Sequence, residues 1–197
     1  MAQLVDLVNR AFSRIGAARI SVLAPESSPA AAMALELAQP RLDALLADHE
    51  WKFATQTLQL TEIDERMPGE SVYTNQFTIP TDCLRFIKTD VPNERWEIHA
   101  QPGGAERRLY VMREAPVYAD MVIRVETGLY PPHVEQAATA ALAAEFAMPI
   151  TRDAAIATFW EQRAAQLLSQ AKVHDWNENP WPEIPDGRYL ADARYGS

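Results

Sequence analysis

The chain has 197 residues, 48% of them hydrophobic, so it is long enough to bury a core and too apolar for a disordered chain. Its single cysteine, Cys83, excludes an intrachain disulfide and a cluster of thiolates around a structural zinc, and it favours folding inside a cell. The formal net charge of -9 argues against a protein that grips nucleic acid, because such proteins need a basic surface.

Residues 2–15 are predicted to form the first helix. Gly16 follows at the position where a left-handed C-cap is expected. Charges at Asp6, Arg10 and Arg14 exclude an export signal or a membrane span, so we expect the mature chain to begin here. The apolar residues recur every three or four positions, on one face, and are Leu4, Val5, Val8, Phe12 and Ile15.

A second helix is predicted to begin at Ser28 and Pro29. Serine is a favoured N-cap, and proline at the first helical position loses no hydrogen bond. The helical spacing continues to His49. Pro40 lies inside this pattern and removes one backbone hydrogen bond, so we expect a kink or break near residues 37–40.

The chain then changes to a β pattern, with short runs of Thr, Tyr, Phe, Ile and Val divided by Gly and Pro. This pattern is typical of antiparallel strands. In the last run, Met121, Ile123 and Val125 alternate and are expected to share one face. The predicted strands cover residues 53–60, 72–79, 84–89, 95–99, 107–112 and 119–126.

Two further helices are predicted after the strands. Pro131 and Pro132 open the third helix, which is expected to end at Met148 before Pro149. Thr151 is predicted to cap the fourth helix. Because each pair of helices has one apolar side, we expect all four to pack together, with the β segment emerging between them.

These elements predict an α+β fold class. An antiparallel helical bundle would form from the N- and C-terminal helix pairs, in residues 1–52 and 130–174. Residues 53–129 would form a central β-rich insertion. Residues 175–197 would form an extended C-terminal tail.

Residues that could carry chemistry do not occur in a catalytic or metal-binding pattern. His49 and Glu50 lack the second histidine of a zinc-binding helix, because Phe53 stands at that position. Cys83 begins an apolar strand, where cysteine is most often a small buried hydrophobe. We therefore predict no enzyme, no catalytic residue, no cofactor and no metal. The weaker candidates, with no supporting spacing, are Glu62, Asp64, Glu65, His99, Gly103, Gly104, Arg107, Arg108, His133 and His174.

The C-terminal tail, DWNENPWPEIPDGRYLADARYGS, has no periodic apolar face but contains two tryptophans and two tyrosines. Such side chains are unfavourable in water, so the tail either folds back on its own domain or docks on a partner. Trp, Tyr and Arg are enriched at interface hot spots, which favours docking. The predicted interface residues are Trp176, Trp181, Arg188, Tyr189, Arg194 and Tyr195.

Four segments occur in the order RIGAARIS, RLDALLADHEWKFAT, FTIPTDCLRF and ALAAEFAMPIT. The most specific pieces are Trp51, Phe53 and Ala54 at the end of a helix, and the run from Pro80 to Arg85. Together they resemble the podophage head-to-tail adaptor family, also called tail tubular protein A. The resemblance covers most of residues 4–172. It implies a helical bundle with a β-rich insertion, a twelvefold ring below the portal vertex and DNA passing through the centre, without catalysis.

The resemblance predicts a virion structural protein, a homo-oligomeric adaptor ring that joins the portal protein to a downstream tail component, either a nozzle or a stopper protein. DNA would pass through the channel without specific binding, and no membrane would be involved. The protein would lie in the virion neck after assembly in the host cytoplasm. Two alternatives are a siphophage-type head-tail connector, which a mainly helical chain would favour, and a cell-wall hydrolase.

Trp51 and Phe53 stand where the helical pattern changes to the β pattern. We predict that they form a structural junction that packs against both parts. His49 and Lys52 are predicted to face outward.

Overall fold

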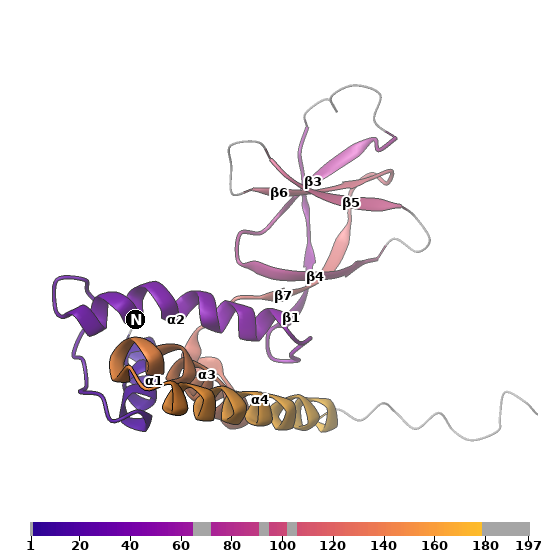
Figure 1. Cartoon of the computed structure of the whole chain (residues 1–197). Coiled ribbons are helices and arrows are strands. Elements are labelled where there is room, and N and C mark those ends of the chain that lie inside the picture. Colours follow the sequence, from indigo (N-terminus) through magenta and orange to yellow (C-terminus); the bar gives the residue numbers. More distant parts are fainter. Residues whose placement is uncertain (1, 65–71, 91–94, 102–105, 179–197) are drawn as a thin grey trace, which may run out of the picture.

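The computed structural model describes residues 2–64, 72–90, 95–101 and 106–178. Figure 1 shows a group of helices beside a group of strands. The helices in the described residues are α1 (Ala2–Arg14), α2 (Pro29–Ala47), η1 (Thr127–Leu129, a 3-10 turn), α3 (Pro132–Thr151) and α4 (Ala154–Asn177). The strands there are β1 (Thr55–Gln59), β2 (Thr61–Glu62), β3 (Asn75–Ile79), β4 (Cys83–Thr89), β5 (Trp96–Ala100), β6 (Arg107–Val111) and β7 (Tyr118–Ile123).

The predicted architecture, a helical bundle carrying a β-rich insertion, is wrong. The described residues form a mixed α+β fold, in which four α-helices lie beside seven strands in two antiparallel sheets. The strands bury a hydrophobic core of their own, which includes Phe77, Leu109 and Val111. The β part therefore has its own hydrophobic core, because its apolar residues pack mainly on one another.

Helix α3 is the centre of the helical part. Ala137 to Ala144 are all buried, which covers two full turns and therefore every side of the helix. Helices α1, α2 and α4 each pack against α3. Alanine side chains are short and let three neighbours approach one helix closely. Helices α1, α2 and α4 thus surround α3.

Strand β7 joins the two cores. It is the middle strand of the sheet β1-β7-β4, while β2-β3-β6-β5 forms the second sheet. Val122 lies in the helical core, whereas its neighbours Met121 and Ile123 lie in the β core. Successive side chains of a strand point to opposite faces, so one strand can serve both cores. The prediction that Met121 and Ile123 share a face is confirmed.

The ends of α1 and the start of α2 follow the sequence signals. Gly16 has a φ of +71°, and the Ala17 amide donates to the Phe12 carbonyl at 2.9 Å, which is a Schellman C-cap. The Ser28 hydroxyl accepts from the Ala31 amide at 3.1 Å. Both predicted caps are confirmed.

Neither internal proline breaks its helix, although a kink or break was predicted near residues 37–40 and the third helix was predicted to end at Met148. Helix α2 runs unbroken past Pro40, and α3 continues through Pro149 to Thr151. Pro149 lies in the last turn of α3, where it removes only one hydrogen bond. The cap of α4 is Asp153 and not Thr151: the Asp153 carboxylate accepts from the amide of Ala155 at 2.8 Å.

Candidate functional site

The loop between α2 and β1 is where Trp51 and Phe53 lie. Trp51 is fully buried, and its indole N–H donates to the Leu45 carbonyl at 3.2 Å. Phe53 packs on the helical core, with its ring centroid 6.1 Å from that of Trp51 and 5.8 Å from that of Tyr130. Both aromatic side chains pack in the helical core, which also contains Val122 of β7, and neither is a member of the β core.

His49 does not face outward, and this prediction is wrong. Its side chain is 20% exposed, and Nε2 lies 3.1 Å from Oδ2 of Asp175, which is itself only 3% exposed. The other oxygen of Asp175 accepts from the Lys52 amide at 3.1 Å, and Lys52 Nζ donates to the Trp176 carbonyl at 3.1 Å. These contacts fasten the last turns of α4 to the α2–β1 loop. The apolar periodicity of α4 does not predict these contacts.

Because of this attachment, α4 extends two residues beyond the predicted start of the C-terminal tail, to Asn177. Trp176 therefore belongs to α4, and its side chain is 63% exposed. The remaining predicted interface residues lie outside the described part of the chain, and they are Trp181, Arg188, Tyr189, Arg194 and Tyr195.

Helix α4 carries an exposed stripe without any ionisable side chain. Its large apolar members, Phe159, Val173 and Trp176, are all more than half exposed. Spacings of three and four residues place the stripe along one side of the helix. Depletion of charge with retention of aromatic residues is typical of the centre of protein interfaces. We name this set the α4 stripe, and its six exposed members are Phe159, Gln162, Gln166, Ser169, Val173 and Trp176.

A groove lies between α2 and α4, with α3 at its floor. Its volume is about 350 Å³. Near one end, Lys172 Nζ on α4 lies 2.6 Å from Asp48 Oδ2. We name this the α2–α4 groove, and it is lined by Arg41, Ala44, Leu45, Asp48, Ala137, Ala141, Glu161, Ala164, Ala165 and Leu168. Half of these lining residues are alanines, and their short side chains leave the space open.

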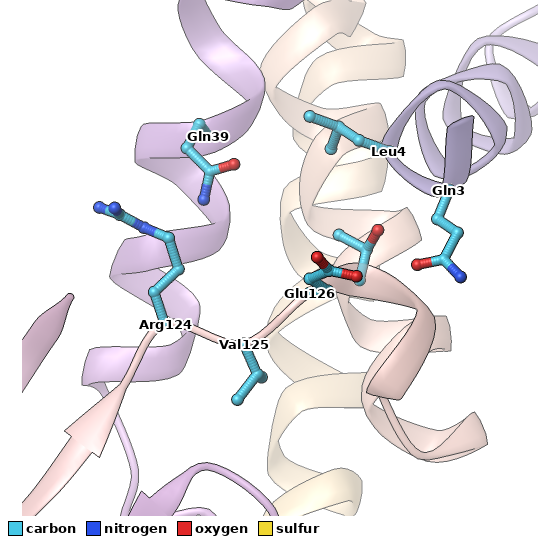
Figure 2. A pocket seen from close by; sticks show the side chains of 7 residues that line it. Gln3, Leu4, Gln39, Arg124, Val125 and Glu126 are labelled. Atoms are coloured by element: carbon cyan, nitrogen blue, oxygen red, sulfur yellow. The ribbon is translucent and has the colours of Figure 1, made fainter. Parts of the chain in front are cut away.

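A second pocket, of about 260 Å³, lies where α1 and α2 meet the segment after β7 (Figure 2). Arg124 is held by the Asp43 carboxylate through Nε at 2.8 Å and Nη2 at 2.5 Å. Gln39 donates to the same carboxylate at 2.8 Å, and Gln3 accepts from the Gly128 amide at 3.1 Å. These polar groups bind one another, and the pair Arg124–Asp43 joins the segment after β7 to α2.

Those weaker candidates for chemistry that the structure describes do not come together as an active site, and Glu65, Gly103 and Gly104 lie outside the described residues. Cys83 is buried, and this burial raises the pKa of its thiol, which disfavours the reactive thiolate. The rings of His133 and His174 stack at 5.6 Å, a contact that their sequence spacing did not reveal. Within the described residues, no group of three or more His, Cys, Asp and Glu side chains could hold a metal ion.

The comparisons with known proteins add no relative. No family model matches the chain, and no curated protein matches it significantly. Among the helices in the described ranges, none combines the length and the apolar character needed to cross a membrane.

Proposed function

We propose that this chain is a virion structural protein that forms a homo-oligomeric head-to-tail adaptor ring. The α4 stripe is the observation that carries the assembly part of this proposal. The resemblance of the four ordered segments to podophage adaptors supplies the location, the neck between the portal protein and a nozzle or stopper protein. The ring would have twelve subunits and would extend the DNA channel.

The α4 stripe supports association because its chemistry fits burial better than exposure. Phe159, Val173 and Trp176 leave apolar surface in water, which is unfavourable unless a neighbour covers it. Gln162, Gln166 and Ser169 are uncharged, so covering them does not require the removal of water from an ion. A closed ring is built from repeated contacts between two different surfaces, and the stripe would be one of them.

The charge of the chain suits a channel through which DNA slides. A net charge of -9 is unfavourable for holding phosphates, and an acidic lining would repel them. We expect the purified protein to bind duplex DNA more weakly than about 1 μM near physiological salt, because few counterions would be released. Fluorescence anisotropy with a labelled duplex at several salt concentrations measures this. Tighter binding with a steep salt dependence contradicts the sliding channel.

The two alternatives are less well supported. A siphophage-type connector was expected to be mainly helical, and the seven described strands speak against it. A cell-wall hydrolase needs an acid and a base placed around a substrate bond. Asp48 and Glu161 both line the α2–α4 groove, but the Asp48 carboxylate is held in an ion pair by Lys172 Nζ at 2.6 Å. Release of soluble fragments from purified wall material, above that from heat-inactivated protein, would favour the enzyme.

Electron microscopy of the protein mixed with portal rings tests the proposal. Added ring density on the tail side of the portal is the expected result. The variant Phe159→Asp should fold but form no ring, because a charge would enter the stripe. Ser13→Asp, which introduces the same charge at an exposed position of α1 outside the stripe and the groove, is the matched control and should assemble. Absence of added density with the unaltered chain would refute the adaptor function.

A further inference from the structure

The α2–α4 groove lacks an occupant among the described residues. Its apolar walls include Leu45 and Leu168, and alanines of α3 form the floor. The share of liquid volume per water molecule is about 30 Å³, so the groove holds on the order of ten waters. A space of this size is wide enough for a large side chain, and apolar walls favour its entry over water.

One rim of the groove carries a hydrogen-bond donor without an acceptor. Nε of Arg41 is buried and forms no hydrogen bond within the described part of the chain. The nearest carboxylate oxygen, Oε2 of Glu145, is 3.8 Å away, which is too long for a hydrogen bond. A carboxylate that entered the groove beside Arg41 would satisfy this donor.

We propose that residues 179–197 of a second copy of this chain bind in the α2–α4 groove, with Trp181 inserted between α2 and α4. The segment follows α4 directly and contains one tryptophan, two tyrosines and the apolar Ile184. An aromatic side chain buries about 150–250 Å² when it is enclosed, and tryptophan is the residue most typical of interface hot spots. Glu183 follows Trp181 by two residues and provides the carboxylate for Arg41.

The reach of the chain favours a second copy over the same copy. Ala164, in the middle of the groove, lies fourteen residues before Glu178 on α4, which corresponds to about 21 Å along the helix. Trp181 follows Glu178 by only three residues, which span about 10 Å at full extension. Trp181 of the same copy therefore falls short of the centre of its own groove.

The prolines of this segment also favour binding to a second copy. Asn179, Trp181 and Ile184 each precede a proline, and residues before proline favour extended backbone. An extended start suits a segment that leads to a neighbour, whereas return to the same groove requires a reversal directly after α4. Restricted backbone also reduces the entropy lost when the segment binds.

This inference rests on the proposed function only in requiring that copies of the chain associate. Its test uses purified protein without portal or DNA, so its failure is distinct from failure of the adaptor function. Two single-cysteine chains are prepared in a Cys83→Ala background. One carries Ala165→Cys in the groove, and the other carries Pro182→Cys beside Trp181. Neither chain alone contains both reacting positions.

Mixing the two chains under mild oxidation should give a disulfide-linked heterodimer. The expected yield is at least about ten times that of a control pair in which Ser13→Cys, exposed on α1, replaces Ala165→Cys. Adding Trp181→Ala to the Pro182→Cys chain should reduce the yield to the control level. Circular dichroism of each variant verifies that it is folded.

Two results would overturn the inference. One is a heterodimer yield no higher than that of the Ser13→Cys control. The other is an internal disulfide in the monomer of a chain that carries both Ala165→Cys and Pro182→Cys, which would show that the segment binds its own groove. Ring formation on a portal, measured separately, would stand in either case.

Discussion

Oδ2 of Asp175 lies 3.1 Å from Nε2 of His49, although 126 residues separate the two in the sequence. The contact joins the last turns of α4 to the loop that follows α2. Asp175 is almost fully buried, and its other oxygen accepts from the Lys52 amide. The Asp175 carboxylate therefore links the end of α4 to the loop after α2, a few residues before the segment 179–197.

Asp175→Ala should lower the free energy of unfolding by about 2–3 kcal/mol, because the Lys52 amide and His49 would lose their shared buried partner. His49→Ala should lower it by about 1 kcal/mol, more than the sequence pattern alone suggests. The two effects should not add in the double variant, since both remove the same contact. Urea denaturation measures all three. Glu161→Ala, exposed on the same helix, is the control, and equal effects of Asp175→Ala and Glu161→Ala would contradict a structural role for Asp175.

Trp51→Ala should lower the free energy of unfolding by about 3–5 kcal/mol, because it leaves a large cavity at the junction. Trp51→Phe retains most of the apolar volume but loses the hydrogen bond to the Leu45 carbonyl, so we expect a loss of about 1–2 kcal/mol. Trp176→Ala removes a side chain that is mostly exposed and should change stability by less than about 0.5 kcal/mol. Thermal and urea denaturation compare the stabilities of the three variants. Similar losses for Trp51→Ala and Trp176→Ala would contradict the role of Trp51 as a core residue.

Gly16→Ala should cost about 1 kcal/mol of stability, because the left-handed backbone at this C-cap disfavours a Cβ atom. No heavy atom lies within 4 Å of the position that a Cβ would occupy, so crowding does not contribute. Gly16→Asn should cost less, since asparagine tolerates this conformation better. Calorimetry of the two variants tests the ranking. If both melt like the unaltered protein, the C-cap of α1 does not limit stability.

A chain that ends at Glu178 should fold as stably as the full chain, since it keeps every contact of α4 among the described residues. A chain that ends at Gln170 should melt at a much lower temperature, because it loses the buried residues Ala171 and Asp175. The first truncation should also lose attachment to portal rings if the segment 179–197 supplies the anchors. Calorimetry and pull-down with portal rings measure the two properties. A large loss of stability in the chain that ends at Glu178 would make that segment part of the folded core.

The segment 179–197 is better separated from the domain at Glu178 than at the sequence-based boundary of residue 175. A cut after Asp175 would remove the Trp176 carbonyl that accepts from Lys52 Nζ. The boundary was misplaced because the apolar periodicity fades near Asp175. The helix continues beyond that residue because Asp175 and Trp176 form hydrogen bonds with Lys52, which is distant in the sequence. A buried carboxylate has no periodic signature, so no pattern in the sequence indicated it.

Local signals in the sequence determined the elements and two of their caps. Gly16 and Ser28 act through backbone groups within a few residues, and β7 follows the alternation of Met121 and Ile123, so neighbouring side chains are enough to predict them. Tertiary structure alone decided that α3 is central, that β7 serves two cores and that Asp175 meets His49. These arrangements depend on which faces cover one another across distant parts of the chain. Apolar periodicity indicates which side of a helix or strand is buried. It does not indicate which other element covers that side, because this depends on packing in three dimensions.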